Sequence, residues 1–491
     1  MALGLAGLTA TASAETILGV TVYTRNGDRT SKHYPNYDLT NLGYAQNQQV
    51  GSDYRARYIA SNAPKQILGI SEDELVQSQV YAMAPAEQTL MKTANAILQG
   101  LYPPLDTNET ETLNNGSSYD APMGGAQFSI VNSVEANTPE AVWLSGDESC
   151  PAMTDIAYSF KMNGAYETKL RETRDFYRSF ADVLENVTEY NGNTPALSYE
   201  KAYDIFDLIN VGLIHNESLR DAVSSDDLFQ LRTLADSQQF GLNFDPSFPY
   251  GAIGARTLSW KIVAHLNETI ASRGATKFSL LAGSYENMLG FFGLQDLTSV
   301  SEDFYGIPDY ASTMAFELFT DNNVTSFPVE EEIDSLRVRF LFRNGSDSST
   351  RLTPYPLFGR NETSLTWDNF RFEMRQTTVE SPEAWCNDCN NNSDMCAALR
   401  RSSNPDHPIS HYSPERMSNA VAGVIGAMVT LGVIAAVAAL AAFMIMRRRW
   451  KRTAPVGIPL AVGADIRRKD SQRSLGSHYS WVSRAPSVRS N

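Results

Sequence analysis

The feature that most constrains this chain is a run of 27 residues, Ala420–Met446, that contains no charged side chain. As a helix the run would be about 40 Å long, which is enough to cross a hydrocarbon layer of about 30 Å with some tilt. A buried helix of a soluble domain is rarely apolar on every side over such a length. We therefore expect a transmembrane helix over 420–446.

The charges on either side of this run indicate its orientation. Arg447–Arg452 follows at once, and a basic cluster of this kind marks the cytoplasmic end of a span. The tail, 447–491, holds eleven basic and two acidic residues, so the net charge of −16 divides into +9 for the tail and −25 for residues 1–446. An acidic body argues against a nucleic-acid partner, which needs a basic surface. We expect the body outside and the tail to be disordered in the cytoplasm.

The N-terminal segment is typical of a secretory signal peptide. Met1–Ala14 is short and apolar and ends in Ala-Ser-Ala, a small-x-small cleavage pattern. It lacks a basic n-region, so we expect some preceding residues to be missing; a buried N-terminal helix is the alternative. Nine Asn-x-Ser/Thr sequons lie outside the tail, which favours a lumenal or extracellular body. The candidate glycosylation sites are Asn108, Asn115, Asn186, Asn216, Asn267, Asn323, Asn344, Asn361 and Asn391.

Such a compartment is oxidising, so the four cysteines are expected to form disulfides. Three pairings are possible, and the sequence does not choose among them. Zinc would need a fourth ligand at finger spacing, which is missing, so no metal is expected. The disulfide candidates are Cys150, Cys386, Cys389 and Cys396.

The body, 15–400, alternates strand and helix patterns. Ile17–Thr24 is almost continuously apolar or β-branched, which is typical of a strand covered on both faces. This order predicts a doubly wound, mostly parallel α/β sheet with helices on both faces. Residues 152–240 are mostly helical in pattern and predict a helical insertion, and the proline-containing segment 401–419 predicts a stalk. Further strands are expected at Gln79–Met83, Lys277–Ala282, Met314–Phe319 and Leu336–Phe342, and helices at Thr40–Ile59, Ala86–Gly100, Glu286–Leu294 and Thr366–Gln376.

The loop after the first strand carries the pattern of an anion site. Arg25 and Arg29 stand four residues apart and bracket Gly27. Guanidinium groups bind phosphate oxygens through two parallel hydrogen bonds, and a glycine lets backbone N–H groups approach an anion. Open α/β sheets bind ligands at the C-terminal ends of their strands. The pattern predicts phosphate binding, with a solvated charged loop as the alternative.

This loop resembles that of the histidine acid phosphatases, the large secreted branch of the histidine phosphatase superfamily that includes phytases. The family signature is Arg-His-Gly-x-Arg-x-Pro after the first strand, and Arg25, Gly27 and Arg29 match it. Asn26 stands in place of the histidine and Ser31 in place of the proline.

Two more segments extend the resemblance over about residues 15–400, and it is greatest to membrane-anchored fungal members. The helix near Gln88 resembles the one that usually carries a third phosphate-binding arginine, so Gln88 takes that position. Ser279–Leu294 resembles the strand and helix around the family's His-Asp pair, which puts Tyr285 at the second histidine and Glu286 at the acid.

These departures bear on the reaction that the resemblance implies. In the family the loop histidine attacks phosphorus, and the attack needs a ring nitrogen with an available lone pair. The nitrogen lone pair of a carboxamide is delocalised, so Asn26 does not replace it. Neutral side chains at two further positions remove charge that would stabilise the transferring group. The implied site is therefore degenerate: Asn26, Tyr285 and the candidate general acid Glu286 at catalytic positions, and Arg25, Arg29 and Gln88 at phosphate-binding positions.

The leading hypothesis is a cell-surface glycoprotein whose ectodomain binds or senses phosphate, a phosphorylated small molecule or a cell-wall ligand without catalysis. Two alternatives stay open: an acid phosphatase with weak or redirected activity, and a structural surface glycoprotein, because fold does not fix function. No cofactor is expected. We expect a type I, single-pass protein of the plasma membrane or a secretory-pathway membrane. Small residues at four-residue spacing in the span would permit self-association.

Overall fold

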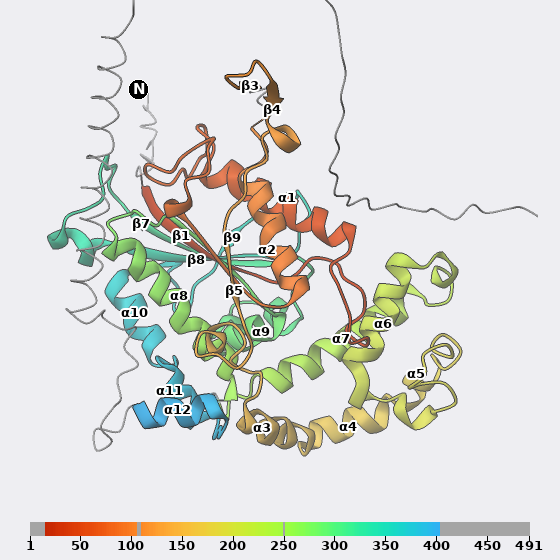
Figure 1. Cartoon of the computed structure of the whole chain (residues 1–491). Coiled ribbons are helices and arrows are strands. Elements are labelled where there is room, and N and C mark those ends of the chain that lie inside the picture. Colours follow the sequence, from red (N-terminus) through yellow and green to blue (C-terminus); the bar gives the residue numbers. More distant parts are fainter. Residues whose placement is uncertain (1–14, 106–109, 249–250, 403–491) are drawn as a thin grey trace, which may run out of the picture. The chain divides into compact units, whose positions relative to one another are not determined.

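The computed structural model describes residues 15–105, 110–248 and 251–402 (Figure 1). The expected signal peptide, transmembrane helix and cytoplasmic tail lie outside these residues, as do the sequon at Asn108 and all of the stalk beyond Ser402. Within the described ranges, no helix has both the length and the apolar character needed to cross a bilayer. The membrane topology therefore stays a prediction.

A mixed sheet forms the centre of the body, with the strand order β10-β8-β7-β1-β6-β2-β5 and β9 paired to β8. From β1 to β5 the neighbouring strands are parallel, whereas β7, β8 and β10 pair antiparallel. The connection from β7 to β8, residues 321–336, contains a 3-10 turn at Glu330–Ser335 but no α-helix, and strands joined without a crossover helix pair in this way. The expected doubly wound α/β sheet is confirmed, with its parallel part on one side of β1. The strands are β1 (Thr16–Thr24), β2 (Val80–Pro85), β5 (Val131–Val134), β6 (Phe278–Ala282), β7 (Thr313–Thr320), β8 (Arg337–Arg343), β9 (Thr353–Pro354) and β10 (Ser364–Thr366).

Helices cover both faces of this sheet (Figure 1). Val20 and Val22 of β1 pack into a core with α1 and α2, whereas Leu18 and Tyr23 pack into a second core with α8, α9 and α10. The α1–α2 pair is tight because a Cβ at Gly51 would meet the Ile97 carbonyl at 2.0 Å. The helices are α1 (Asn41–Tyr58), α2 (Gln88–Leu101), α8 (Ile253–Ala271), α9 (Tyr285–Leu294) and α10 (Trp367–Arg375).

The chain between β5 and α8 is mostly helical, over the range where a helical insertion is predicted. Ile205 and Ile209 of α6 and Leu231 of α7 are buried in the same core as α9, so the insertion is part of the body rather than a detached module. Its first helix begins directly after Cys150. The helices are α3 (Pro151–Lys161), α4 (Gly164–Glu172), α5 (Arg174–Arg178), α6 (Ala202–His215) and α7 (Ser225–Asn243).

Two disulfides close the C-terminal end of the body, and they use all four cysteines. Cys150 pairs with Cys389 over a sequence separation of 239, and Cys386 pairs with Cys396. The first bond ties the start of the insertion to α11, and the second ties α11 to α12. The expected disulfide participation is confirmed and the pairing is now defined. The remaining elements are the hairpin β3 (Thr110–Thr112) and β4 (Ser118–Asp120), α11 (Pro382–Asp388) and α12 (Asp394–Ser402).

Candidate functional site

The site loop, residues 25–40, leaves the C-terminal end of β1 and is pressed against the start of α1. A Cβ at Gly27 would meet the Gly43 carbonyl at 2.3 Å, so only glycine allows this approach. The Gly27 N–H donates to Asn47 Oδ1 at 2.7 Å, and Thr40 caps α1 by accepting from the Gly43 N–H. The sequence pattern Arg-x-Gly therefore serves loop–helix packing first.

Arg25, the first residue of the loop, is buried but has no anionic partner. Its side chain is enclosed by aromatic rings, with the guanidinium carbon 5.1 Å from the Tyr285 centroid and 4.8 Å from that of Tyr310. It donates one hydrogen bond, to the Pro308 carbonyl, and its Nε has none. Among the described residues, no carboxylate lies within ion-pair distance of it, and burial lowers the pKa of Arg25. Arg25 is thus an uncompensated cation, 4% exposed.

Asn26, the residue at the expected nucleophile position, folds back onto the loop. Its side-chain Nδ2 donates to the Gly27 backbone carbonyl at 2.7 Å, and its backbone carbonyl accepts from the Ala311 N–H at 2.9 Å. The residue is 5% exposed. Its carboxamide therefore acts as an internal hydrogen-bonding group.

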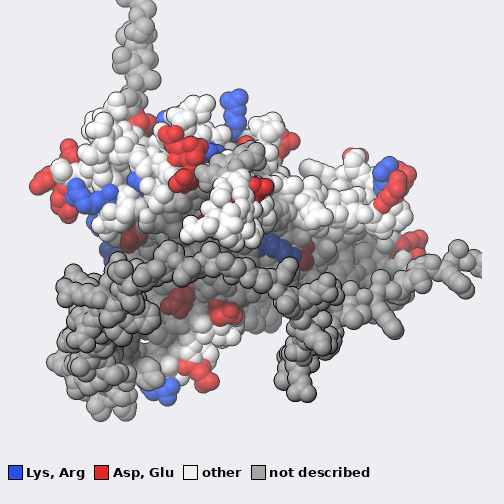
Figure 2. Space-filling view, turned by 45° about the horizontal axis from the view of Figure 1, so that its top comes forward, with Lys and Arg blue, Asp and Glu red and all other residues white. Residues whose placement is uncertain are grey.

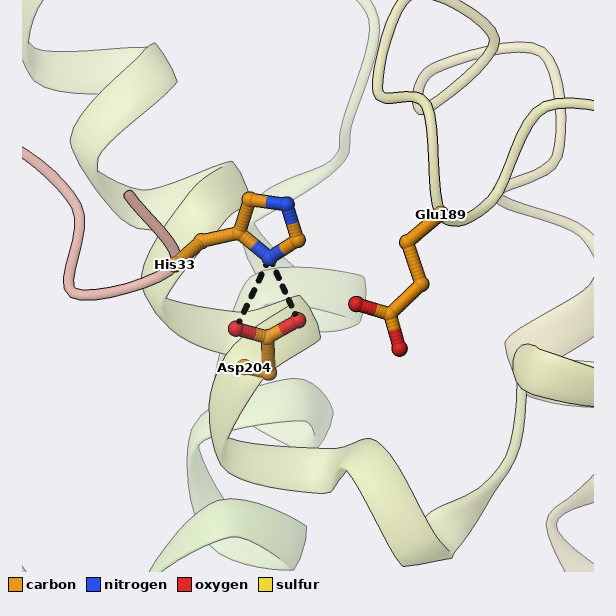
Figure 3. Close-up of side chains that lie close together, drawn as sticks. All are labelled: His33, Glu189 and Asp204. Carbon is orange, nitrogen blue, oxygen red and sulfur yellow. Dashed lines mark hydrogen bonds and ion pairs between the residues drawn. The ribbon is translucent and has the colours of Figure 1, made fainter. Parts of the chain in front are cut away.

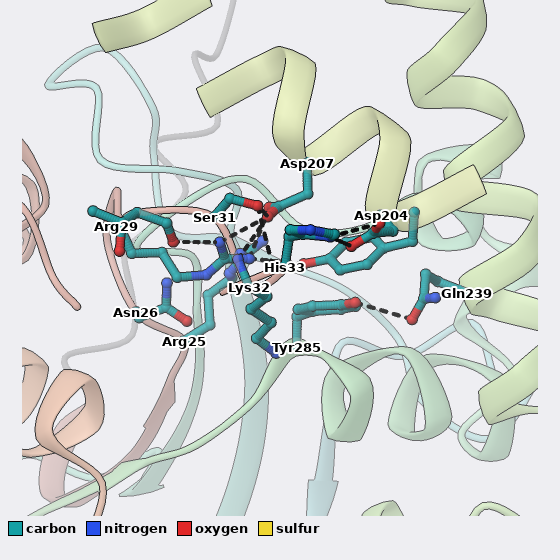
Figure 4. A network of polar contacts seen from close by, with 12 residues as sticks. Arg25, Asn26, Arg29, Ser31, Lys32, His33, Asp204, Asp207, Gln239 and Tyr285 are labelled. Atoms are coloured by element: carbon teal, nitrogen blue, oxygen red, sulfur yellow. Dashed lines mark hydrogen bonds and ion pairs between the residues drawn. The ribbon is translucent and has the colours of Figure 1, made fainter. Parts of the chain in front are cut away.

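Arg29, by contrast, forms an ion pair with a carboxylate (Figure 4). Its Nη1 and Nη2 donate to the two oxygens of Asp207 on α6 at 3.1 and 2.9 Å, and Nη2 also donates to the Tyr203 hydroxyl at 2.8 Å. Burial opposes its charge, but the Tyr203 oxygen and the Asp207 carboxylate raise the pKa of Arg29 well above its ordinary value. The Ser31 hydroxyl and the Lys32 N–H donate to the same carboxylate at 2.7 and 2.9 Å.

Tyr285, at the expected second-histidine position, is buried beside Arg25 and Tyr203. It is 1% exposed, and its hydroxyl donates to Gln239 Oε1 of α7 at 2.9 Å (Figure 4). Its ring lies beside the Arg25 guanidinium and 5.4 Å from the Tyr203 ring. Gln88, at the expected third-arginine position, is exposed at the start of α2 and makes no hydrogen bond to these residues. The structure thus gathers Arg25, Asn26, Arg29, Tyr285 and Glu286 around one loop and leaves Gln88 outside the network.

A pair of carboxyl groups lies beside the loop. Lys32 Nζ is 3.2 Å from Glu286 Oε1. Burial raises the pKa of Glu286, but the Lys32 charge together with hydrogen bonds from the Glu286 backbone, Ser284 and Lys32 brings the pKa below its usual value. For Asp147, burial and then the Glu286 charge raise the pKa to about 7. Glu286 is therefore ionised while Asp147 holds its proton below neutral pH, so Asp147 is a candidate proton donor. The sequence did not single out Asp147.

The loop is also tied to α6 by two histidines. His33 Nδ1 lies 3.0 Å from Asp204, with Glu189 nearby (Figure 3), and the three ligand atoms lie within 4.8 Å of one another. Such a trio could hold a metal ion, but Asp204 also accepts from the Tyr190 hydroxyl, and Glu189 pairs with Lys201 at 2.9 Å. We therefore interpret the trio as part of an ion-pair network.

The second histidine contact involves His215, which is exposed at the end of α6 and which the sequence did not single out as a partner of the loop. Its Nε2 lies 2.7 Å from Oδ2 of the fully buried Asp28. The sequence signal for this pairing was Asp28 itself, an acid in a loop that follows a buried strand. A carboxylate that becomes buried there needs a partner. The signal for Asp207 was similar: it is an acid within the apolar helical stretch 202–214.

An open cavity of about 370 Å³ lies against this network. Arg25, Tyr203, Asp207 and Tyr310 line it, whereas Arg29 does not, because Asp207 stands between Arg29 and the open space. The volume is within the range of small-molecule sites. Only one of the two expected phosphate-binding arginines therefore borders a space that a ligand can enter.

The net charge of the body does not attract anions. Figure 2 shows acidic and basic side chains interspersed in small groups over the visible described surface. This agrees with the excess of acidic residues in the body. Of the two arginines that line the cavity, Arg232 pairs with Asp236 and Asp309, so Arg25 is the one without a carboxylate partner.

Seven of the eight described sequon asparagines are exposed, and one corrects the prediction. Asn391 is 6% exposed, and its Nδ2, the atom that would carry a glycan, donates to the Ser149 carbonyl at 2.6 Å. Asn391 is therefore removed from the candidate glycosylation sites. The exposed asparagines are Asn115, Asn186, Asn216, Asn267, Asn323, Asn344 and Asn361.

A sequence profile of the histidine phosphatase superfamily (branch 2) matches residues 22–343. Phytase structures are similar in fold: the apo form from Hafnia alvei has 11% identity and a TM-score of 0.49, covering 76% of this chain and 99% of that chain. The phytase from Citrobacter braakii has 11% identity and a TM-score of 0.47, covering 76% and 99%, and that from D. castellii has 11% and 0.48, covering 81% and 87%. No curated protein matches the chain in sequence.

Proposed function

Because the chain belongs to the histidine phosphatase superfamily, branch 2, we propose that its body is a non-catalytic member of that family, which binds an acidic ligand at Arg25 instead of hydrolysing it. The observation that carries the proposal is the contrast at the site loop. The position of the attacking histidine is occupied by Asn26, whose carboxamide donates to the Gly27 carbonyl, while Arg25 is a buried cation without a carboxylate partner.

The absence of phosphoryl transfer follows from the chemistry of the groups that are present. The Asn26 carboxamide has no free nitrogen lone pair with which to form a phosphorylated intermediate. Losing a nucleophile costs on the order of 10⁶ in rate. The two histidines near the loop do not replace it, because neither His33 nor His215 lines the cavity beside Arg25. Glu286 and Asp147 retain proton-transfer capacity, but an acid without a nucleophile does little.

Ligand binding is supported by the energetics of Arg25. A buried cation without a partner is costly, and an anion in the adjacent cavity would remove that cost. Each hydrogen bond from a charged donor contributes about 1.5–3 kcal/mol, so two from Arg25 give about 3–6 kcal/mol. This corresponds to a Kd between about 6 mM and about 40 μM for one oxyanion. A phosphorylated small molecule or an acidic cell-wall component would gain more from Tyr203 and Tyr310 in the cavity wall.

The proposed setting is the outer face of a membrane. The expected span, basic tail and signal peptide support a type I surface glycoprotein at the plasma membrane or a secretory-pathway membrane, and self-association through the span is part of this proposal.

One observation favours a second function, an acid phosphatase of weak or redirected activity: the carboxyls of Asp147 and Glu286 sit in opposite protonation states, which is the arrangement that acid–base chemistry requires.

The test uses the full chain, purified in a mild detergent. With p-nitrophenyl phosphate between about pH 3 and about pH 7, we expect turnover at least about 10⁶-fold below a kcat of about 10 s⁻¹. Inorganic phosphate should raise the melting temperature of the parent chain but not of Arg25→Gln. Arg220→Gln, at an exposed arginine of the insertion, is the matched control and should respond as the parent does. Robust turnover that is lost in Arg29→Ala would support the enzyme instead, and neither turnover nor binding would support a structural glycoprotein.

A further inference from the structure

The carboxylate of Asp207 receives four hydrogen bonds from one short stretch of the site loop. Two come from the Arg29 guanidinium, one from the Ser31 hydroxyl and one from the Lys32 backbone N–H, at 2.7–3.1 Å. The residue is 3% exposed. A guanidinium fork, a hydroxyl and a main-chain N–H converging on one point are the donors with which proteins bind small oxyanions.

We propose that Asp207 is an internal ligand, whose carboxylate fills an oxyanion cradle built by Arg29, Ser31 and the Lys32 N–H, and that removing it opens a site for a small oxyanion. The inference deepens the proposed function and rests on it in one respect, namely that Arg25 is the cation left for an external ligand. It explains why the two expected phosphate-binding arginines differ. Arg29 binds the internal carboxylate of Asp207, whereas Arg25 is left for an external anion.

Ser31 is the second observation behind this proposal. It stands where the family signature has a proline, and a proline side chain has no hydrogen to donate. In this chain the hydroxyl donates to Asp207 at 2.7 Å. The departure from the signature therefore adds a donor directed at the internal carboxylate.

The cradle also has an entrance, which an ordinary buried salt bridge lacks. Asp207 lines the open cavity of about 370 Å³, together with Arg25 and Tyr203. Truncating its side chain would connect the space around the Arg29 guanidinium to that cavity. A small anion could then enter the vacated space and make the contacts that the carboxylate makes now.

The experiment is an anion rescue of Asp207→Ala, again on the full chain in detergent. The variant should melt below the parent, because Arg29 becomes an unpaired buried charge. Formate, which has the atoms that the substitution removes, should raise its melting temperature by at least about 3 °C at about 50 mM, relative to chloride at equal ionic strength. Phosphate and sulfate should act similarly. The parent should gain less from formate, because only Arg25 is open to the anion there.

Asp204→Ala is the matched control, because Asp204 lies one turn earlier on α6 and binds His33 and Tyr190 rather than Arg29. It should lose stability without gaining a formate response. Adding Arg29→Gln to Asp207→Ala should abolish the rescue, whereas adding Arg25→Gln should leave it. This last pair separates the cradle from the proposed function, since Arg25→Gln removes only the phosphate response of the parent.

Two outcomes would overturn the proposal: a folded Asp207→Ala that gains no more from formate than the parent does, or a rescue that survives Arg29→Gln. If Asp207→Ala does not fold, Asp207→Ser removes the charge and vacates most of the carboxylate volume while keeping one acceptor. Sulfate should then stabilise this variant at least about two-fold more than the parent, and an equal response would refute the cradle.

Discussion

Asp147 offers a sharp test of the electrostatics around the loop, because its carboxyl is held neutral where an ordinary aspartate is ionised. Burial, followed by the Glu286 and Glu148 charges, raises the pKa of Asp147 from 3.8 to about 7. Unfolding exposes the group and returns its pKa to the ordinary range. Between about pH 4 and about pH 7 the unfolded chain therefore binds fewer protons at this position than the folded chain does, so Asp147 makes the fold less stable as the pH rises.

The magnitude follows from the size of the shift. A difference of about 3 pKa units corresponds to about 4 kcal/mol at 1.36 kcal/mol per unit. Asp147 is partly exposed, so solvent screening reduces this to between about 2 and about 4 kcal/mol. Asp147→Asn cannot ionise and escapes the penalty. Relative to the parent, this variant should gain that amount in free energy of unfolding when the pH is raised from about 4 to about 7.5.

The assay is urea denaturation of the parent and Asp147→Asn at both pH values, with linear extrapolation to water. Asp155→Asn, at an exposed acid on α3, is the matched control and should follow the parent at both pH values. Glu286→Gln should reduce the effect only in part, since burial is the larger cause of the shift. A parent and Asp147→Asn whose stabilities differ by the same amount at both pH values would refute the assignment of a neutral Asp147.

Two further outcomes follow from the same geometry. Asn26→His restores an imidazole at the attacking position, but it should leave kcat at least about 10⁴-fold below about 10 s⁻¹ on p-nitrophenyl phosphate, because Arg29 stays bound to Asp207; a rate within about 10²-fold would contradict this. In a secretory host, glycopeptide mass spectrometry after enzymatic deglycosylation should find Asn267 and Asn361 modified and Asn391 unmodified, since its Nδ2 is engaged; a glycan on Asn391 would contradict the buried placement.

Local patterns were sufficient for most of the fold. The apolar run at Ile17–Thr24 is a central strand because it is covered on both faces, and the polar-to-helical change at Thr40 marks a real N-cap. The helical insertion followed from the apolar spacing between residues 152 and 240. The strand directions beyond β1 did not follow, because they depend on connections whose path is not encoded in any single strand.

The sequence predicted the residues of the site loop but not their partners. The two arginines and the glycine could be read from one loop, but their partners lie far along the chain, Asp207 at a separation of 178 residues from Arg29. A pairing over that distance leaves no periodic signal in the sequence. Local patterns therefore indicated two equivalent cations, although tertiary contacts make one of them paired and the other free of a carboxylate.

The departures from the family signature are better explained as a rebuilt interface than as decay of an active site. Ser31 donates to Asp207 of α6, and the Tyr285 hydroxyl donates to Gln239 of α7, so two changed positions each gain a partner in the insertion. Decay would instead leave several charges unpaired in the core, at a cost of about 3–5 kcal/mol each. In the site loop only Arg25 is left in that state. A structural role alone does not need its charge, because a neutral side chain of similar length would stack on the same rings without desolvating a cation. The charge at Arg25 is therefore best explained by a ligand, and its replacement should remove phosphate binding rather than stability.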